Sequence, residues 1–248
     1  MSRFRLVTLA EDPSLDFGRV PTGFEEYNDH GEVLADLWGR LTTDFLEYQF
    51  LLFEGDDPVG RGQTIPFVWD GTIEGLGEGI DHIVRTGCAD FDAGRRPNTL
   101  SALLGVVASD RRGQGIAADV IRGMGEIGAQ HGLADLVAPV RPNLKRAYPL
   151  TPIERYITWT RDDGLPLDPW LRVHVRLGAE FLAPAPRSLK ITGTVAEWEE
   201  WTGVAMPESG EYLFRDALQP VTIDRERDLG TYYEPNVWMI HRGLGTRG

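Results

Sequence analysis

Residues 99–121 read TLSALLGVVASDRRGQGIAADVI and contain the centre of the predicted fold. Residues 99–108 are almost continuously apolar, which is typical of a strand covered on both faces of a sheet. From Ile116 onward apolar side chains recur at helical spacing, and Gly132 supplies a helix stop. The sequence therefore predicts a central strand, a glycine-containing turn and a helix that runs to about His131.

The turn between this strand and helix carries two glycines and two arginines. The first N–H groups of a helix have no partner within the helix, and the helix dipole is positive there. Gly113 and Gly115 would let an anion approach these groups closely, and Arg111 and Arg112 add positive charge. We therefore interpret the turn as a phosphate-binding site, with glycines that serve only the turn as the alternative.

The remaining elements follow from the same periodicities and from cap residues. The three later helices open at Thr151, Asp168 and Thr194, and the first of these has the pattern of a capping box closed by Glu154. Gly178 ends the second of them. The other predicted elements are a strand at 4–9, a helix within 30–45, a hairpin at 47–71, a helix near 79–87, a strand at 135–140, and strand-like segments at 210–214, 218–223 and 236–241.

The chain shows no internal repeat and no convincing linker. A single domain over 1–248 is therefore predicted, with a core of about 1–184 and a C-terminal extension of about 185–248. Residues 141–167 have the look of an insertion that either roofs the acceptor site or packs on the core. The extension, rich in tryptophan, either walls the site or forms a homodimer surface.

The composition of the chain argues against several classes of binding partner. The net charge of −13 argues against nucleic acid and favours either a cationic small molecule or mere solubility. One cysteine and five scattered histidines give no disulfide framework and no metal-ligand cluster. No stretch is apolar enough to span a membrane, and the start turns acidic before a signal-peptide core can form. We expect a cytoplasmic protein without a membrane or metal partner.

Two kinds of nucleotide ligand fit the turn. Gly113, Gly115 and Ala118 satisfy the dinucleotide pattern G-x-G-x-x-A. However, SDRR separates them from the strand, a hairpin precedes the unit, and the next strand ends at Arg141 without an acidic residue for a ribose. An NADP-dependent oxidoreductase, in which an arginine would accept the 2′-phosphate, is therefore the minor alternative.

The stretch RGQGIA is more similar to the pyrophosphate motif of the GNAT superfamily of acyl-CoA-dependent N-acyltransferases. That motif consists of Arg or Gln, two residues of any type, Gly, one residue of any type, and Gly or Ala, which Arg112, Gly115 and Ala117 match. Residues 103–121 resemble the family's central strand, turn and helix, and residues 168–181 resemble its closing helix and next strand. The matches cover about a third of the chain. The resemblance implies an α/β (α+β) fold with a mixed, mostly antiparallel sheet flanked by helices.

The resemblance also implies how the co-substrate binds. The central strand splays from its neighbour, and the pantetheine arm of acetyl-CoA or another acyl-CoA pairs with the exposed backbone of Gly105, Val106 and Val107. Donors near Val107 would stabilise the oxyanion formed when an amine attacks the thioester. The diphosphate would be held by the turn residues Arg111, Arg112, Gly113, Gln114, Gly115, Ile116 and Ala117.

The implied reaction is acetyl transfer to the primary amine of a small molecule by direct attack in a ternary complex. Many members of the family have a tyrosine that acts as the general acid, four residues before the glycine that ends the last helix. In this chain that glycine is Gly178, and the residue four positions earlier is His174. Imidazole can donate a proton near neutrality, so His174 is the first candidate acid and Tyr148 the second. No general base stands out, although a water chain to Asp90, Asp92 or Glu234 is conceivable. Because the tyrosine is missing and no base is identified, a catalytically inactive acyl-CoA-binding or regulatory module is the alternative function.

Overall fold

The computed structural model describes residues 3–133 and 135–246, so residues 1–2, 134 and 247–248 of the predicted domain lie outside it. The strands are β1 Arg5–Thr8, β2 Gln49–Glu54, β3 Asp57–Phe67, β4 Thr99–Val107, β5 Asp135–Val140, β6 Glu180–Gly193, β7 Gly210–Tyr212, β8 Val221–Asp224 and β9 Leu229–Arg242. The helices are α1 Glu32–Leu37, α2 Ile80–Asp92, α3 Ile116–Gln130, α4 Ile153–Tyr156, α5 Pro169–Arg176 and α6 Val195–Thr202.

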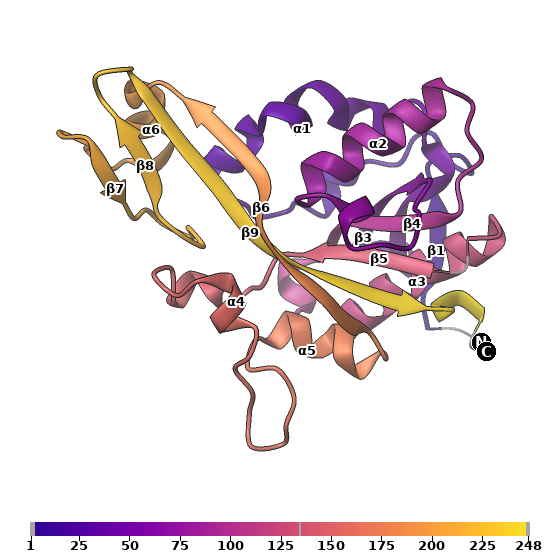
Figure 1. Ribbon diagram of the computed structural model, residues 1–248. Coiled ribbons are helices and arrows are strands. Elements are labelled where there is room, and N and C mark those ends of the chain that lie inside the picture. The colour runs from indigo at the N-terminus through magenta and orange to yellow at the C-terminus, as the bar shows by residue number, and fades with distance from the viewer. Residues whose placement is uncertain (1–2, 134, 247–248) are drawn as a thin grey trace.

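These strands form a single mixed sheet in the order β1-β2-β3-β4-β5-β9-β8-β7, with β6 also paired to β9. Among the strands of residues 3–133 and 135–246, only β4 and β5 pair in parallel, and the other pairings are antiparallel. In Figure 1 α1 and α2 cover one face of the sheet, and α3 and α5 cover the other. The predicted mixed, mostly antiparallel sheet flanked by helices is confirmed.

The central unit has the predicted form. β4 is followed by a tight turn and by α3, whose buried side chains Ile116, Val120, Met124 and Ile127 pack on the sheet with Phe50 and Leu100. The helix ends before Gly132, which has a φ of +73° and therefore adopts the left-handed conformation that glycine tolerates. The strand, turn and helix thus place the glycine-arginine turn at the start of α3.

Two of the three predicted caps are present. The Asp168 side chain accepts from the N–H groups of Trp170 and Leu171 at the start of α5, and Thr194 forms a full capping box with Glu197 at the start of α6. The predicted box at Thr151 is wrong. The Thr151 N–H instead closes a turn onto the Tyr148 carbonyl at 3.0 Å, and the extended Pro152 precedes a helix of only four residues without a side-chain cap.

The two long strands β6 and β9 reach beyond the rest of the sheet. At their far end α6, β7 and β8 form a small lobe, as Figure 1 shows. β6 runs through residue 185, where the extension is predicted to begin, and the division into core and extension stays a prediction. Within the described ranges, none of the helices is both long and apolar enough to cross a membrane.

Candidate functional site

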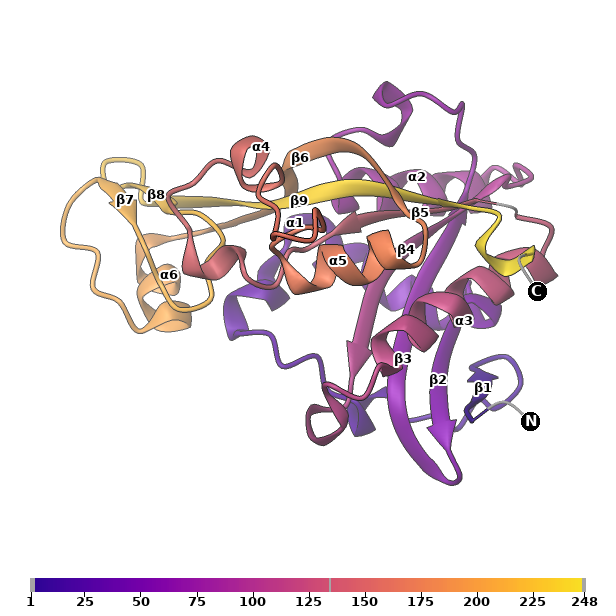
Figure 2. The same ribbon diagram turned by 90° about the horizontal axis from the view of Figure 1, so that it is seen from below.

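The two parallel strands in the middle of the sheet separate soon after they begin. β4 and β5 pair only at Leu100 with Leu136 and at Ser101 with Val137. Figure 2 shows the strands then leaving in different directions, β4 beside β3 and β5 beside β9. Because each strand keeps its outer partner, the inner edges of both strands face a gap.

The backbone of β4 presents polar groups to this gap. The Ala108 N–H donates to the Val59 carbonyl of β3 at 3.0 Å. Since backbone polar groups of a strand alternate between its two edges, Val106 also faces β3, whereas Gly105 and Val107 face the gap. Two of the three predicted pantetheine-binding residues therefore turn their N–H and C=O groups to the unpaired edge.

The turn that follows β4 is open to solvent. Gly113 and Gly115 have φ values of +80° and +84°, and a β-carbon added to either would meet no atom within 4 Å. Gly115 is the N-cap of α3 and offers no side chain to the first N–H groups of the helix. Among the described residues, no turn or loop carbonyl accepts a hydrogen bond from the N–H groups of residues 113–115, and no side chain caps the start of α3. This geometry fits a diphosphate, which needs closely approachable donors at a helix start.

The two arginines of the turn have different surroundings. The Arg111 guanidinium lies 3.2 Å from the Glu54 carboxylate and close to Asp57 and Asp110. Arg112 is exposed, its Nη2 lies 3.9 Å from where a β-carbon of Gly23 would stand, and no carboxylate of the described residues pairs with it. Arg112 is therefore the side chain available to a phosphate. The predicted role of Arg111 is not supported, because its guanidinium faces carboxylates and its N–H donates to the Ala108 carbonyl at 2.9 Å.

α5 lies against β4 through Trp170, whose Cζ2 is 3.6 Å from the β-carbon position of Gly105. The Trp170 ring in turn contacts the His174 ring edge-on, with centroids 4.8 Å apart. His174 is buried, and its Nδ1 lies 2.9 Å from Nε2 of His241 in β9. Its Nε2 is buried without a hydrogen-bond partner among the described residues.

Burial and the neighbouring His241 hold the pKa of His174 well below its ordinary value. The imidazole is therefore neutral at pH 7. His241 itself is a residue that sequence reasoning missed, because it lies 67 residues further along the chain in β9 and meets His174 only through the tertiary fold. Its one signal in the sequence is a histidine inside a predicted strand.

Tyr148 lies elsewhere, on the insertion. It is 39% exposed, and its ring contacts Trp159 edge-on at 5.0 Å and Tyr156 at 6.2 Å. His174 shares none of these contacts, so the structure does not bring the two candidate acids together.

The insertion is fastened to the start of α5 by one buried carboxylate. Besides capping the helix, Asp168 accepts from the Leu144 N–H at 2.7 Å and from the Tyr156 hydroxyl at 2.8 Å. The Asp168 carboxylate therefore has a structural role, because it joins the insertion to the start of α5.

The three carboxylates considered as distant bases are all engaged. Asp90 pairs with Arg95 and accepts from the Val68 N–H, and Asp92 pairs with Arg40. Glu234 is buried, and its Oε2 lies 2.9 Å from Arg141 Nε. The two side chains form an ion pair, but these two atoms are not aligned for a hydrogen bond. Among the described residues, no group of three His, Cys, Asp or Glu side chains is placed to hold a metal ion.

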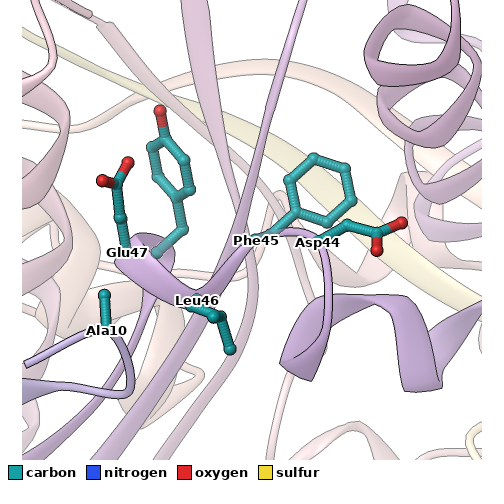
Figure 3. A pocket seen from close by; sticks show the side chains of 6 residues that line it. Ala10, Asp44, Phe45, Leu46 and Glu47 are labelled. Atoms are coloured by element: carbon teal, nitrogen blue, oxygen red, sulfur yellow. The ribbon is translucent and has the colours of Figure 1, made fainter. Parts of the chain in front are cut away.

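Two hollows of the described surface lie apart from the turn. One, of about 230 Å³, is lined by Ala10 and residues 44–48; Figure 3 shows Glu47 on one side of it and Phe45 and Asp44 on the other. Tyr48 contacts His131 just beyond the C-terminal end of α3, so this pocket is at the opposite end of the helix from Gly115. A second, of about 270 Å³, lies between α1, α2 and β6, where burial raises the pKa of Asp81 to about 6.

Comparison with known proteins identifies one relative by sequence and several solved structures with a similar fold. No family model matches the sequence. The chain is 34% identical over 237 residues to the arginine N-acetyltransferase avaD of Aspergillus versicolor, a match that covers 84% of this chain and 81% of that protein.

Two solved structures share the fold. The loading GNATL domain of CurA from Lyngbya majuscula has a TM-score of 0.62 at 15% identity, over 99% of this chain and 100% of that one. The GphF GNAT-like decarboxylase in complex with isobutyryl-CoA has a TM-score of 0.50 at 13% identity, over 97% and 99% of the two chains.

Proposed function

We propose that this chain, which belongs to the GNAT superfamily and is an acyl-CoA-dependent N-acyltransferase, transfers the acetyl group of acetyl-CoA to a small cationic molecule. The acceptor group is a primary amine. The observation that carries the proposal is the combination of the β4–β5 gap with the open glycine turn at the start of α3. Arginine is the first acceptor to test, because the curated relative is an arginine N-acetyltransferase.

The roles of the residues follow from their positions. Gly105 and Val107 offer backbone donors and acceptors along the gap for the pantetheine arm and the thioester carbonyl. The N–H groups of residues 113–117 and the Arg112 guanidinium hold the diphosphate. The acceptor amine attacks the thioester carbonyl directly, with the backbone donors of β4 stabilising the negative charge that develops on oxygen.

His174 is proposed to help the thiolate leave. In the tautomer in which His241 donates to His174 Nδ1, the His174 Nε2 carries a hydrogen and has no other partner among the described residues. A neutral imidazole can then stabilise the departing sulfur by a hydrogen bond. This assignment needs no imidazolium, which is consistent with the depressed pKa of His174.

The test of the activity is release of free thiol from acetyl-CoA in the presence of arginine, agmatine, ornithine, putrescine, polyamines and aminoglycosides. We expect acceptor-dependent thiol release and a product heavier by one acetyl group in mass spectrometry. If no amine caused thiol release while acetyl-CoA stabilised the protein thermally, the result would instead support the catalytically inactive acyl-CoA-binding module. Stabilisation by NADP alone would support the oxidoreductase. A cytoplasmic location and a homodimer stay predictions from the sequence.

His174→Ala is expected to lower kcat about 100-fold while the KM for acetyl-CoA stays within about 3-fold, because the side chain acts on the leaving group and not on the diphosphate. The substitution also empties a buried site, so the variant's fold is checked by circular dichroism, and His174→Gln offers a polar replacement of similar length. His131→Ala is the matched control, since His131 lies beyond the far end of α3. An unchanged kcat in both His174 variants would remove this residue from the mechanism.

A further inference from the structure

Arg61 of β3 is a half-buried cation without an acidic partner. No Asp or Glu oxygen of the described residues lies within 4 Å of its guanidinium. Its neighbours are the Gln63 side-chain oxygen, which accepts from Nε at 3.2 Å and from Nη2 at 2.5 Å, and the Phe17 carbonyl at 3.5 Å from Nη1. Burial lowers the pKa of this guanidinium, although it stays charged at neutral pH.

Such an arrangement is costly, because a charge taken out of water normally gains a counter-ion. The more deeply buried Arg141 of this chain faces a carboxylate, that of Glu234. Gln63 is a neutral acceptor, so the guanidinium is held in a fixed direction without being neutralised. The missing counter-ion is one that a ligand can supply.

Arg61 lies near the gap between β4 and β5, and its side chain is directed along β3. Arg61 lies opposite Val106 of β4, and Gln63 lies opposite Leu104. Because its guanidinium is bonded to Gln63, the side chain runs along β3 toward the place where β4 and β5 begin to separate. On the other face of the sheet, the β-carbon position of Gly62 would meet Phe50, which packs with α3, so Arg61 faces away from α3.

The glycine turn, where the diphosphate is proposed to bind, is continuous with α3. The face that Arg61 occupies, beneath Phe17 and its neighbours, is therefore the opposite one. An amine that reaches the gap from that face would carry its other functional groups past Arg61.

We propose that Arg61, oriented by Gln63, binds a carboxylate of the acceptor, and that the preferred acceptors are therefore amino acids rather than simple amines. This inference rests on the proposed function and names a specificity-determining residue for the same site. Guanidinium and carboxylate match in geometry, and such a charge-assisted pair discriminates by about 10- to 100-fold when it is sheltered from water.

The test compares arginine with agmatine, which is arginine without its carboxylate and keeps the same primary amine and guanidinium. We expect the wild-type protein to acetylate arginine with a kcat/KM at least about 10-fold above that for agmatine. Arg61→Gln is expected to abolish this preference by lowering kcat/KM for arginine, with agmatine turnover and the KM for acetyl-CoA unchanged.

Gln63→Glu supplies a second and independent variant, because it places a carboxylate against Arg61 while keeping the arginine. It is expected to remove the preference in the same way, and Arg61→Lys is expected to restore part of it. Equal rates with both acceptors in the wild-type protein would overturn the inference and leave the proposed function standing. Equal losses for both acceptors in Arg61→Gln would show a structural role and also overturn it. No thiol release with any amine would be a failure of the proposed function itself.

Discussion

Gly115→Val is expected to raise the KM for acetyl-CoA by about 10- to 100-fold and to leave kcat at saturation within about 3-fold. The β-carbon would project into the open space over the first N–H groups of α3, where we place the diphosphate. Loss of one charge-assisted hydrogen bond, at about 1.5–3 kcal/mol, accounts for this range. Initial-rate kinetics and calorimetric titration with coenzyme A measure it.

A matched control exists at the opposite end of α3. Gly132 also has a positive φ, of +73°, and also has open surroundings, but it follows the C-terminal end of α3. Gly132→Val therefore carries the same kind of backbone strain, about 1–3 kcal/mol, without touching the proposed phosphate site. Similar changes of KM in the two variants would mean that strain, and not the site, is responsible, and the cofactor assignment would fall.

Asp168→Ala is expected to lower the free energy of unfolding by about 3–5 kcal/mol. The substitution removes a helix cap, at about 0.5–2 kcal/mol. It also leaves the half-buried Leu144 N–H without its acceptor, at about 1 kcal/mol, and the buried Tyr156 hydroxyl without its acceptor, at about 1–3 kcal/mol. For a chain of this size the melting temperature should fall by roughly 10 °C. Differential scanning calorimetry measures this change.

The appropriate control is a cap that does nothing else. Thr194→Ala removes the exposed capping box of α6 and should cost only about 1 kcal/mol. Asp168→Asn should fall between the two, because the amide keeps one accepting oxygen. If Asp168→Ala were no more destabilising than Thr194→Ala, the carboxylate would not be fastening the insertion to α5.

The elements that could be predicted from the sequence are those with a local cause. The apolar run of β4, the spacing of α3 and the caps at Asp168 and Thr194 depend on neighbouring residues, and all are present as predicted. At Thr151 the same local pattern gave a wrong prediction, since a turn to Tyr148 uses the backbone that the cap would have needed. Local patterns thus succeed until a competing contact of similar strength is available.

The candidate site divides in the same way. The glycine turn is visible in the sequence because its chemistry resides in consecutive residues. The pairing of His174 with His241, the engagement of Arg111 by Glu54 and the unpaired Arg61 depend on strands that meet only in the folded sheet. Composition and spacing carry no information on such partners, because ion pairs between distant segments leave no periodic trace.

The divergence of β4 from β5 has a thermodynamic consequence. A strand edge inside a sheet is a surface that another extended chain completes, and a pantetheine arm with its two amides is such a chain. The backbone groups that folding leaves unpaired are the ones that we propose the thioester carrier to pair with. The native state would then be stabilised in proportion to the logarithm of the carrier concentration once that concentration exceeds the dissociation constant. In a cell rich in acetyl-CoA, the supply of acetyl groups would govern how long the enzyme survives as well as how fast it works.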